Sequence, residues 1–409
     1  MSNRSNRNPD LDRTICIVGL GYIGLPTAAV LASRGYTVHG VEIDARAAEI
    51  INSGKAHIVE PELDILVRAA VGTGKLKAHA TPATSDVFML CVPTPLDDAR
   101  APDLSYVRSA TETISPFLEK GNLVILESTS PPGTTELVAS IVAERTSLAA
   151  GDVQFAHAPE RVLPGKILRE VVENDRIIGG IDDASTAACA DFYRTFVAGK
   201  LLLTTARMAE TAKLVENAFR DVNIGFANEL SLMAEALELD VWELIRLANH
   251  HPRVNILSPG PGVGGHCIAV DPWFLIDRVP DQTPLMRAAR EVNNAKPDWV
   301  VERVRRRAGR LRSPRIACLG LAYKPDIDDL RESPALAIAR RLAEIPDVEL
   351  RVVEPNLESH PEFELHSLED ALEGADVVVA LVGHHQFLGV AAHELAEKAV
   401  FDVCGVWRG

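Results

Sequence analysis

The stretch RTICIVGLGYIGLPTAAVLASRGYTVHGVEID, residues 13–44, constrains the fold of this chain more than any other part of the sequence. Gly19, Gly21 and Gly24 follow a short apolar run and open a helical pattern. Glycines at this spacing let the backbone approach a pyrophosphate, while the helix N-terminus supplies N–H groups and a partial positive charge. The stretch therefore predicts a strand, a tight turn, a helix and a second strand that together bind a dinucleotide.

A carboxylate at the end of the second predicted strand indicates which dinucleotide is bound. Glu42 lies 18 residues after Gly24, where it would accept hydrogen bonds from a ribose diol and repel a 2′-phosphate. This favours NAD over NADP as the cofactor, although Arg46 lies close by in the sequence. We expect Tyr22 and Ile23, which stand between the glycines, to line the same site.

The alternation of apolar runs and helical stretches predicts the fold class. Such alternation is typical of a parallel sheet with helices on both faces, and it resumes after Pro314, where RIACLGLAYKPDIDD resembles the first glycine turn without its later glycines. We therefore predict an α/β fold of two Rossmann-like parallel-sheet domains joined by a long central helical segment. The predicted boundaries are 1–205, 206–310 and 311–409, with ligands in a cleft between the outer domains.

The central segment is predicted to be helical from its composition. Residues 206–250 contain no proline and a single glycine, and their apolar residues recur at helical spacing. We expect one long helix followed by a second helix that Asp240 caps, and a further helix over about 284–309.

The charge balance and the terminal sequence exclude several classes of function. A formal net charge of −15 argues against a nucleic-acid-binding surface, which would need a basic stripe. The first residues lack the apolar segment of a signal peptide, and no run of about 18 apolar residues exists to span a membrane. We expect a cytoplasmic protein that binds neither nucleic acid nor membrane.

Five of the six cysteines fit a reducing compartment. Cys16, Cys91, Cys318 and Cys404 lie in short apolar runs that are expected to be buried strands, and Cys189 lies in an alanine-rich helical stretch. We expect all five to act as small apolar side chains.

Cys267 is the exception, because it lies in the glycine-rich loop PGPGVGGHCIAVDP. A zinc site with His266 is one alternative, but no further ligands at metal-binding spacing follow, so we expect no metal. A loop cysteine without a role is another. The functional interpretation is a thiolate nucleophile. Together with a dinucleotide, it suggests that an alcohol is oxidised to an aldehyde and then, as a thioester, to a carboxylate.

Other polar residues stand where a site is expected. Lys213 and Asn217 are four residues apart in TAKLVENAF and would share one helix face, although a solvated lysine is the plain alternative. Thr129 in ESTSPPGTT and Thr94 in CVPTP follow strands and would lie near the glycine turn, although helix capping and turn formation explain such residues equally well. Glu160 in HAPERVLPGK is, by itself, an ordinary loop acid.

Taken together and in order, these motifs resemble the UDP-sugar 6-dehydrogenase family. The resemblance extends over nearly the whole chain from about Arg13 and rests on the glycine turn and on ESTSPPGTT, APERVLPGK, TAKLVENAF, GGHCIAVD and KPDIDDLRESP. Within the family, HPRVNILSPGPGVGGHCIAVDPWFL and HIVEPELD look most like the members that act on UDP-N-acetyl-D-mannosamine. The resemblance implies an NAD-dependent four-electron oxidation of that sugar to its uronate.

The resemblance also implies catalytic roles for matching residues. Cys267 would be the nucleophile that forms the thiohemiacetal and the thioester. Lys213 and Asn217 would stabilise oxyanion character at the reacting carbon, which a cation does best in a dry site. Asp271 would help to orient or activate water.

Further roles follow from the resemblance for the bound ligands. Glu160 and Thr129 match positions that serve the proton-transfer and water steps. The last domain would hold UDP, and Arg331 would contact NAD. The implied substrate contacts are Glu160, Arg161, Lys213, Asn217, Arg253, Gly264 and Lys324.

A homodimer is implied as well, with the long central helices as its interface. Arg253 would then reach the active site of the partner subunit.

Several alternatives stay open from the sequence. Members that use UDP-glucose often carry GGSC and PKD near the cysteine, whereas this chain has GGHC and AVD, which favours an N-acetylated sugar and leaves the role of His266 open. UDP-N-acetylglucosamine and UDP-glucose remain alternative substrates. A two-electron NAD-dependent dehydrogenase and a non-catalytic NAD-binding regulator are the alternatives from other classes.

Overall fold

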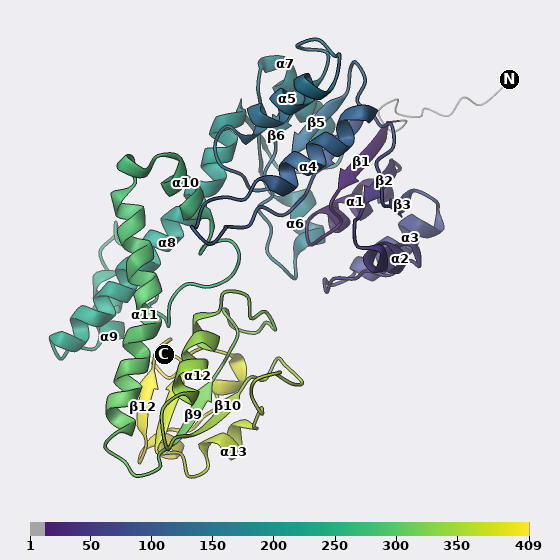
Figure 1. Ribbon diagram of the computed structural model, residues 1–409. Helices are drawn as coiled ribbons and strands as arrows, with labels where there is room; N and C mark the ends of the chain where they lie inside the picture. Colours follow the sequence, from purple (N-terminus) through teal and green to yellow (C-terminus); the bar gives the residue numbers. More distant parts are fainter. Residues whose placement is uncertain (1–12, 409) are drawn as a thin grey trace. The chain divides into compact units, whose positions relative to one another are not determined.

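The computed structural model describes residues 13–408, which form two compact units (Figure 1). The first unit contains the chain up to Leu214 together with Trp273–Arg278, and the second contains Val215–Pro272 and the chain from Val279 onward. The three predicted domains, with boundaries after residues 205 and 310, stay a prediction.

In the described part of the first unit, eight strands form one sheet in the order β3-β2-β1-β4-β5-β6-β7-β8. Neighbouring strands run parallel except for β6 and β7, which are antiparallel. The strands are β1 (Thr14–Val18), β2 (Thr37–Val41), β3 (Leu76–His79), β4 (Val87–Leu90), β5 (Leu123–Leu126), β6 (Gln154–His157), β7 (Arg176–Gly180) and β8 (Leu201–Thr205).

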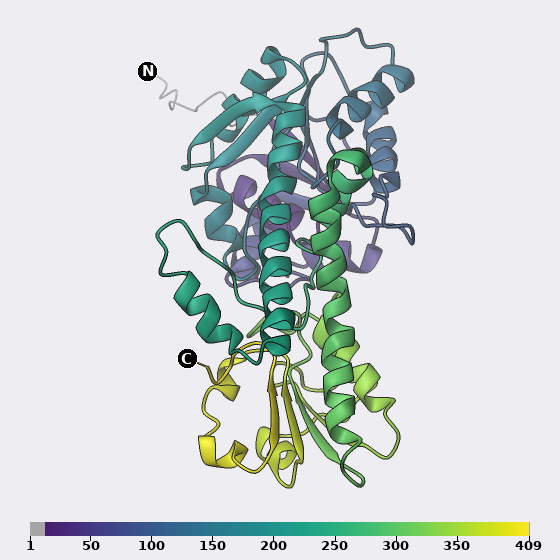
Figure 2. The ribbon, with the colours of Figure 1, turned by 90° about the vertical axis from the view of Figure 1, so that its left-hand side faces the viewer.

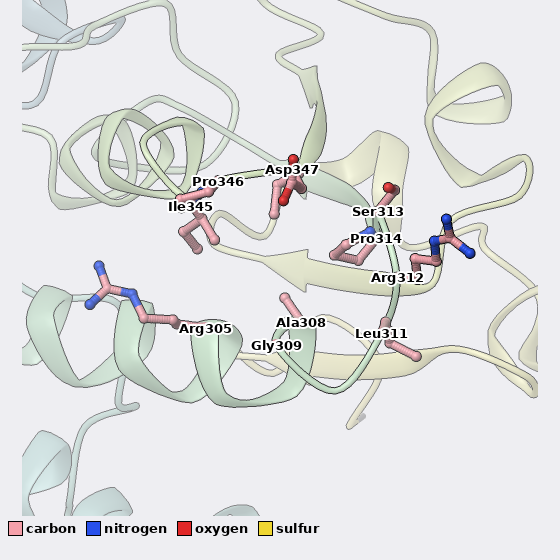
Figure 3. A pocket seen from close by; sticks show the side chains of 11 residues that line it. Arg305, Ala308, Gly309, Leu311, Arg312, Ser313, Pro314, Ile345, Pro346 and Asp347 are labelled. Atoms are coloured by element: carbon pink, nitrogen blue, oxygen red, sulfur yellow. The ribbon is translucent and has the colours of Figure 1, made fainter.

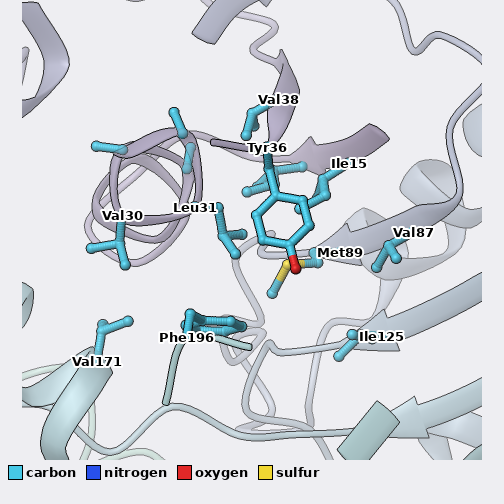
Figure 4. Close-up of a cluster of buried hydrophobic side chains, with 14 of the residues drawn as sticks. Ile15, Val30, Leu31, Tyr36, Val38, Val87, Met89, Ile125, Val171 and Phe196 are labelled. Atoms are coloured by element: carbon cyan, nitrogen blue, oxygen red, sulfur yellow. The ribbon is translucent and has the colours of Figure 1, made fainter. Parts of the chain in front are cut away.

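Both faces of this sheet are buried, as the apolar strand sequences require. Ile15 and Ile17 of β1 point into one apolar core, shown in Figure 4, while Cys16 and Val18 point into another on the opposite face. The helices of this unit are α1 (Gly24–Ser33), α2 (Ala45–Asn52), α3 (Leu63–Gly72), α4 (Ser105–Ile114), α5 (Thr134–Arg145), α6 (Ile167–Glu173) and α7 (Asp183–Tyr193). Residues of α1, α3, α6 and α7 pack into the first core and residues of α4 and α5 into the second. The predicted Rossmann-like architecture is confirmed.

The predicted central helices are also present. They are α8 (Ala206–Ala236), α9 (Val241–Ala248) and α11 (Pro284–Ala308), and a helix that was not predicted, α10 (Asp271–Arg278), lies between α9 and α11 in the sequence. As predicted, the Asp240 side chain caps α9 by accepting hydrogen bonds from the backbone of Trp242 and Glu243. In the second unit, α8 and α11 lie side by side (Figure 2), and Gly225 allows the close crossing because a Cβ there would stand 3.1 Å from that of Ala289.

The described part of the second unit contains a four-stranded parallel sheet in the order β10-β9-β11-β12. Its strands are β9 (Arg315–Leu319), β10 (Glu349–Val353), β11 (Val377–Ala380) and β12 (Ala399–Asp402), and its helices are α12 (Pro334–Ala343), α13 (Leu368–Leu372) and α14 (Ala392–Leu395). Alternate residues of β9 again enter two different apolar cores. The second α/β domain predicted from RIACLGLAYKPDIDD is therefore confirmed.

The cysteine predictions need one correction. Cys16 and Cys318 are buried in strands and Cys189 is buried in α7, as predicted. Cys91 and Cys404 instead follow the ends of β4 and β12 and are half-buried.

No helix in residues 13–408 is long and apolar enough to cross a membrane.

Candidate active site

The glycine turn after β1 has the geometry of a dinucleotide cradle. Gly19 has φ +91°, and a Cβ on it would stand 2.6 Å from the carbonyl oxygen of Cys91. A Cβ on Gly24 would stand 1.8 Å from the carbonyl oxygen of Gly19, so the packing of the turn against α1 requires both glycines. At Gly21, by contrast, a Cβ would meet no atom of the described chain within 4 Å. Its lack of a side chain leaves open space beside the turn, as the predicted pyrophosphate contact requires.

The flanking residues complete this cradle. Glu42 is half-buried, and its carboxylate accepts hydrogen bonds from the backbone N–H groups of Leu20 (3.1 Å) and Asp44 (3.0 Å). Tyr22 is 44 % exposed and Ile23 is half-buried within the turn. The carboxylate thus lies beside the glycine turn, where a ribose diol would reach it.

The two polar loops after β4 and β5 meet at the same edge of the sheet. The Thr94 hydroxyl donates a hydrogen bond to the carbonyl of Thr129 (2.6 Å), and Ser128 donates to the carbonyl of Val92 (2.7 Å). The Ser130 hydroxyl donates to the carbonyl of Ser128. These contacts join the loops to each other, and helix capping, the alternative left open by the sequence, is not the role of these hydroxyls.

Glu210 of α8 caps α5 instead, which the sequence did not indicate. Its carboxylate accepts hydrogen bonds from the N–H of Gly133 (2.6 Å) and from the N–H (2.7 Å) and hydroxyl (2.6 Å) of Thr135. Burial raises the pKa of Glu210 to about 7, against the opposing effect of these hydrogen bonds. The loop that carries Thr129 is therefore held by α8.

Glu160 follows β6 and belongs to a buried charged group. Its side chain is 8 % exposed, and one of its oxygens lies 3.7 Å from the guanidinium of Arg176. Burial raises the pKa of Glu160 to about 7; the charge of Arg176 opposes this effect and that of Glu127 reinforces it. Glu60, from HIVEPELD, fixes the same loop by accepting hydrogen bonds from Gly165 and Ile167 (both 2.8 Å).

Arg161 contacts the chain on the other side of this loop. Its guanidinium donates a hydrogen bond to the carbonyl of Asp175, while its own carbonyl accepts one from Asn174 (3.0 Å). The predicted substrate contact of Arg161 stays a prediction.

Lys213 is buried rather than solvated. It is 8 % exposed, and its charge acts on His157, the fully buried last residue of β6. Burial lowers the pKa of His157 to about 3, with Lys213 acting in the same direction, so this imidazole is neutral. The plain alternative of a solvated lysine is therefore wrong.

Asn217 and Asp271 are brought together by the fold of the second unit. The Asn217 amide donates a 2.6 Å hydrogen bond to the Asp271 carboxylate, and these residues are 8 % and 3 % exposed. The N–H of Asp271, the first residue of α10, donates to the carbonyl of Cys267 (2.9 Å). Cys267 is exposed, in contrast to the other five cysteines. An exposed thiol thus stands directly before a helix that begins with a buried carboxylate.

The glycine-rich loop before Cys267 packs against the loop before α12. The N–H of Gly265, which has φ +78°, donates to the carbonyl of Arg331 (3.1 Å). A Cβ on Gly264 would stand 2.5 Å from the carbonyl oxygen of Glu332, so this predicted substrate contact is a glycine that close packing requires. The Arg331 guanidinium is held by the Asp329 carboxylate at 2.6 and 3.0 Å.

Two other predicted residues lie in exposed loops. Lys324 is exposed in the loop after β9, and Arg253 is exposed in the loop after α9. Their predicted substrate contacts stay predictions.

Besides Glu210, the sequence reasoning missed three residues of the site, namely Glu127, Arg176 and His157. Each is a polar residue that begins, ends or directly follows a strand of mostly apolar residues, and this position was the available signal.

The surface pocket in Figure 3 is not this site. It has a volume of about 550 Å³ and is lined by residues around Arg312, Pro314 and Pro346, at the amino ends of β9 and β10. Ligands of open α/β sheets bind at the carboxyl ends of the strands.

Comparison with known proteins identifies three domains of one family. Residues 13–197 match the NAD binding domain of the UDP-glucose/GDP-mannose dehydrogenase family, residues 207–295 match its central domain, and residues 317–409 match its UDP binding domain.

Individual relatives cover nearly the whole chain. An NDP-N-acetyl-D-galactosaminuronic acid dehydrogenase of Ralstonia nicotianae is 52 % identical over 98 % of both chains. A UDP-N-acetyl-D-mannosamine dehydrogenase of Campylobacter jejuni is 51 % identical over 93 % of this chain and 98 % of its own. The solved structure of a UDP-N-acetyl-mannosamine dehydrogenase from S. aureus matches with a TM-score of 0.89 and 41 % identity, covering 97 % of this chain and 96 % of that chain.

Proposed function

The chain belongs to the UDP-glucose/GDP-mannose dehydrogenase family, and we propose that it oxidises UDP-N-acetyl-D-mannosamine to the corresponding uronate through a thioester on Cys267. It is an oxidoreductase that uses NAD, as its NAD-binding domain and its relatives require. The observation that carries the proposal is the exposed thiol of Cys267 directly before the buried Asn217–Asp271 pair.

The chemistry requires a nucleophile that holds the aldehyde between two oxidations. When bound, NAD supplies the hydride acceptor for each of them. The Cys267 thiolate adds to the aldehyde carbon to form a thiohemiacetal, whose oxidation gives a thioester. Water then attacks the thioester, the carboxylate is released and the thiol is restored.

Charged and polar groups around the reacting carbon would stabilise the oxyanions of these steps. We assign this role to Lys213, whose cation is withdrawn from water, and to the Asn217 amide. Asp271 accepts a hydrogen bond from that amide and would orient the attacking water.

Proton transfer is assigned to Glu160, with Thr129 beside the cofactor. A carboxyl group whose pKa is about 7 can take up and return a proton near neutral pH, which suits a general base for the attacking water. Thr129 lies at the sheet edge where Thr94 fixes its backbone.

We assign the remaining ligand contacts as follows. Gly19, Gly21 and Gly24 would hold the NAD pyrophosphate, Glu42 the ribose, and Arg331 a further part of the dinucleotide. The other assigned contacts are those of Tyr22, Ile23 and Thr94 with NAD, and those of Arg161, Gly264 and Lys324 with the nucleotide sugar.

We further propose a homodimer formed through α8. Apolar side chains are exposed at heptad-like spacing along one stripe of this helix and the turn that follows it, namely Val215, Phe219, Phe226 and Met233 in the helix and Leu237 directly after it (41–67 % exposed). Such a stripe is suited to a second copy of the same helix. Arg253 would then act at the partner's site. Thiol cysteines and a nucleotide-sugar substrate are consistent with a cytoplasmic enzyme.

A second substrate has specific support. The relative from Ralstonia nicotianae is named for an N-acetyl-D-galactosaminuronic acid, so an NDP-N-acetylgalactosamine is the second candidate. Competition between the sugars tests this choice: a clear preference for UDP-N-acetylgalactosamine, UDP-N-acetylglucosamine or UDP-glucose would contradict the first assignment.

The decisive experiment measures NADH formed per UDP-N-acetyl-D-mannosamine consumed. We expect a ratio of two for the native enzyme and a turnover reduced by more than about 1000-fold for Cys267→Ser. Cys404→Ser, which changes another thiol, is the control and should keep the ratio of two. A ratio of one that Cys267→Ser leaves unchanged would overturn the thioester route.

A further inference from the structure

A buried group of charged side chains lies behind Glu160 in the first unit. One Arg176 nitrogen stands 3.5 Å from a Glu127 oxygen and 3.7 Å from a Glu160 oxygen. The three side chains are 3 %, 1 % and 8 % exposed. They meet because β7 runs antiparallel to β6, which brings Arg176, the first residue of β7, to the carboxyl ends of β5 and β6.

The guanidinium of Arg176 is fixed from several directions. Its nitrogens donate hydrogen bonds to the carbonyls of Pro159 and Val171 (both 3.4 Å), and its carbon lies 5.3 Å from the centre of the Tyr193 ring. Pro159 directly precedes Glu160, so the same guanidinium holds both the backbone and the carboxylate at this position.

Glu127 and Glu160 accept hydrogen bonds from different parts of the chain. The two oxygens of Glu127 accept hydrogen bonds from the Cys91 thiol (3.1 Å) and the Tyr193 hydroxyl (3.4 Å). The Glu160 carboxylate accepts hydrogen bonds from the backbone N–H groups of Arg161 and Val162, in its own loop. These donors favour the ionised form of each carboxylate, and Glu127 is the closer of the two to the guanidinium.

The charges in this group do not balance when both carboxylates are ionised. One guanidinium then faces two negative charges away from water, which is costly, and a proton on Glu160, the carboxylate farther from the guanidinium, relieves this cost. The other titratable groups facing this cluster are the Cys91 thiol after β4 and the Cys189 thiol and Tyr193 hydroxyl of α7. Burial raises the pKa of all three above their usual values, so they stay neutral.

We propose that Glu127 and Arg176 are a positioning pair for Glu160. The guanidinium holds the Glu160 carboxylate at the end of β6, and Glu127 determines how much of the positive charge is left to stabilise it. Burial raises the pKa of Glu160 to about 7, which agrees with a carboxylate that Arg176 compensates in part. The inference rests on the proposed proton-transfer role of Glu160.

The test is the pH profile of kcat with NAD and UDP-N-acetyl-D-mannosamine. Glu160→Gln first identifies the acid limb that belongs to Glu160, since that limb disappears in this variant. Glu127→Gln then removes the competing negative charge, which lowers the pKa of Glu160. The limb should therefore move to lower pH by about one unit.

A milder variant keeps the test valid if Glu127→Gln does not fold. Cys91→Ala removes one donor to ionised Glu127, so Glu127 is protonated for a larger share of the time. The acid limb of the kcat profile should therefore also move to lower pH, by less than in Glu127→Gln. Arg169→Gln, which breaks an exposed pair with Glu173 on α6, is the matched control and should leave the profile unchanged.

The outcomes separate the two proposals. If Glu160→Gln removes a limb that neither Glu127→Gln nor Cys91→Ala moves, the positioning pair is overturned while the role of Glu160 stands. If Glu160→Gln leaves the profile unchanged, the proton-transfer role fails and this inference fails with it.

Discussion

Two turns of this molecule, GLGY after β1 and GLAY after β9, start alike and continue differently. The N–H of Gly19 donates to the carbonyl of Val41 at 2.9 Å, and the N–H of Gly320 donates to that of Val353 at 2.8 Å. Both glycines are left-handed, with φ +91° and +94°. The two sheets therefore begin their first crossover with the same backbone.

The turns differ first at Gly21 and Ala322, and a larger difference follows five residues after the first glycine. Gly24 allows α1 to start at once against the turn, whereas Pro325 occupies the corresponding place and α12 starts only at Pro334. A glycine that permits close packing makes a tight phosphate cradle, and its loss releases a loop, which here carries Lys324 and Arg331.

The carboxylates that follow β2 and β10 also differ, in how far the protein buries them. Glu42 is half-buried beside its turn, but Glu354 is 3 % exposed. Glu354 accepts hydrogen bonds from the N–H groups of Leu321 (2.7 Å) and Ala322 (3.0 Å) and from the imidazole of His384 (3.1 Å). One carboxylate lies where a ribose can approach, and the other is enclosed by the protein.

The largest effect is expected at Gly24. In Gly24→Ala the new methyl group would stand 1.8 Å from a backbone oxygen, so the turn and α1 must separate. We expect a loss of about 3 kcal/mol or more in the free energy of unfolding and at least a 100-fold loss of kcat/KM. Pro325→Ala, at the corresponding place after β9, should keep NAD binding. Equal losses of stability and of kcat/KM in Gly24→Ala and Pro325→Ala would contradict the difference drawn here between the two turns.

A smaller effect is expected at Gly21, where the fold itself leaves room. Gly21→Ala should melt like the native protein but raise the KM for NAD roughly 30-fold, about 2 kcal/mol, because its methyl group occupies the pyrophosphate site. Ala322→Gly is the matched change in the other turn and should leave this KM unaltered. An unchanged KM in Gly21→Ala would mean that the first turn is not the cradle.

The two carboxylates should separate binding from stability. Glu354→Gln should cost about 1–2 kcal/mol in the free energy of unfolding and leave the KM for NAD unchanged, because its partners are inside the protein. Glu42→Gln should instead raise the KM for NAD about fivefold. Urea denaturation and initial rates measure both, and a KM effect of Glu354→Gln would contradict the assignment.

The smallest effect concerns pH. Burial raises the pKa of Glu354, but the hydrogen bonds from His384 and the turn outweigh burial, and the pKa is lowered overall. The resulting stability is complete at neutral pH and is lost as pH falls below the usual glutamate range, about 4.3, through the pKa of the folded state. The native protein should therefore exceed Glu354→Gln in its free energy of unfolding by a smaller margin at pH 3 than at pH 7. The margin should shrink by less than about 1 kcal/mol over this range. A difference in the free energy of unfolding that stays constant between pH 7 and pH 3 would contradict this prediction.

Local patterns predicted the fold because they act within a few residues. The glycine turn, the proline-free helix α8 and the Asp240 cap all depend on neighbours in the sequence. Cys267, Asn217 and Asp271 were predicted through their motifs; the structure pairs the side chains of Asn217 and Asp271 and joins the backbones of Asp271 and Cys267 by a hydrogen bond.

The residues that support the site could not be predicted in this way. Glu210 caps a helix 75 residues away in the sequence, and Arg176 pairs with Glu127 across 49 residues. Such contacts depend on strand order and on the reversal of β7, which no local periodicity encodes. The burial of Lys213 is likewise a tertiary property.

The homodimer proposed above would cover the exposed stripe of α8, and this bears on the fate of a chain that has not yet paired. A separated protomer presents Phe219 and Phe226 to water along with three further apolar side chains. Chaperones and proteases recognise such surfaces, and other unfolded chains adhere to them. A substitution that weakens pairing would therefore lower the amount of protein in the cell while each assembled enzyme still works at its full rate.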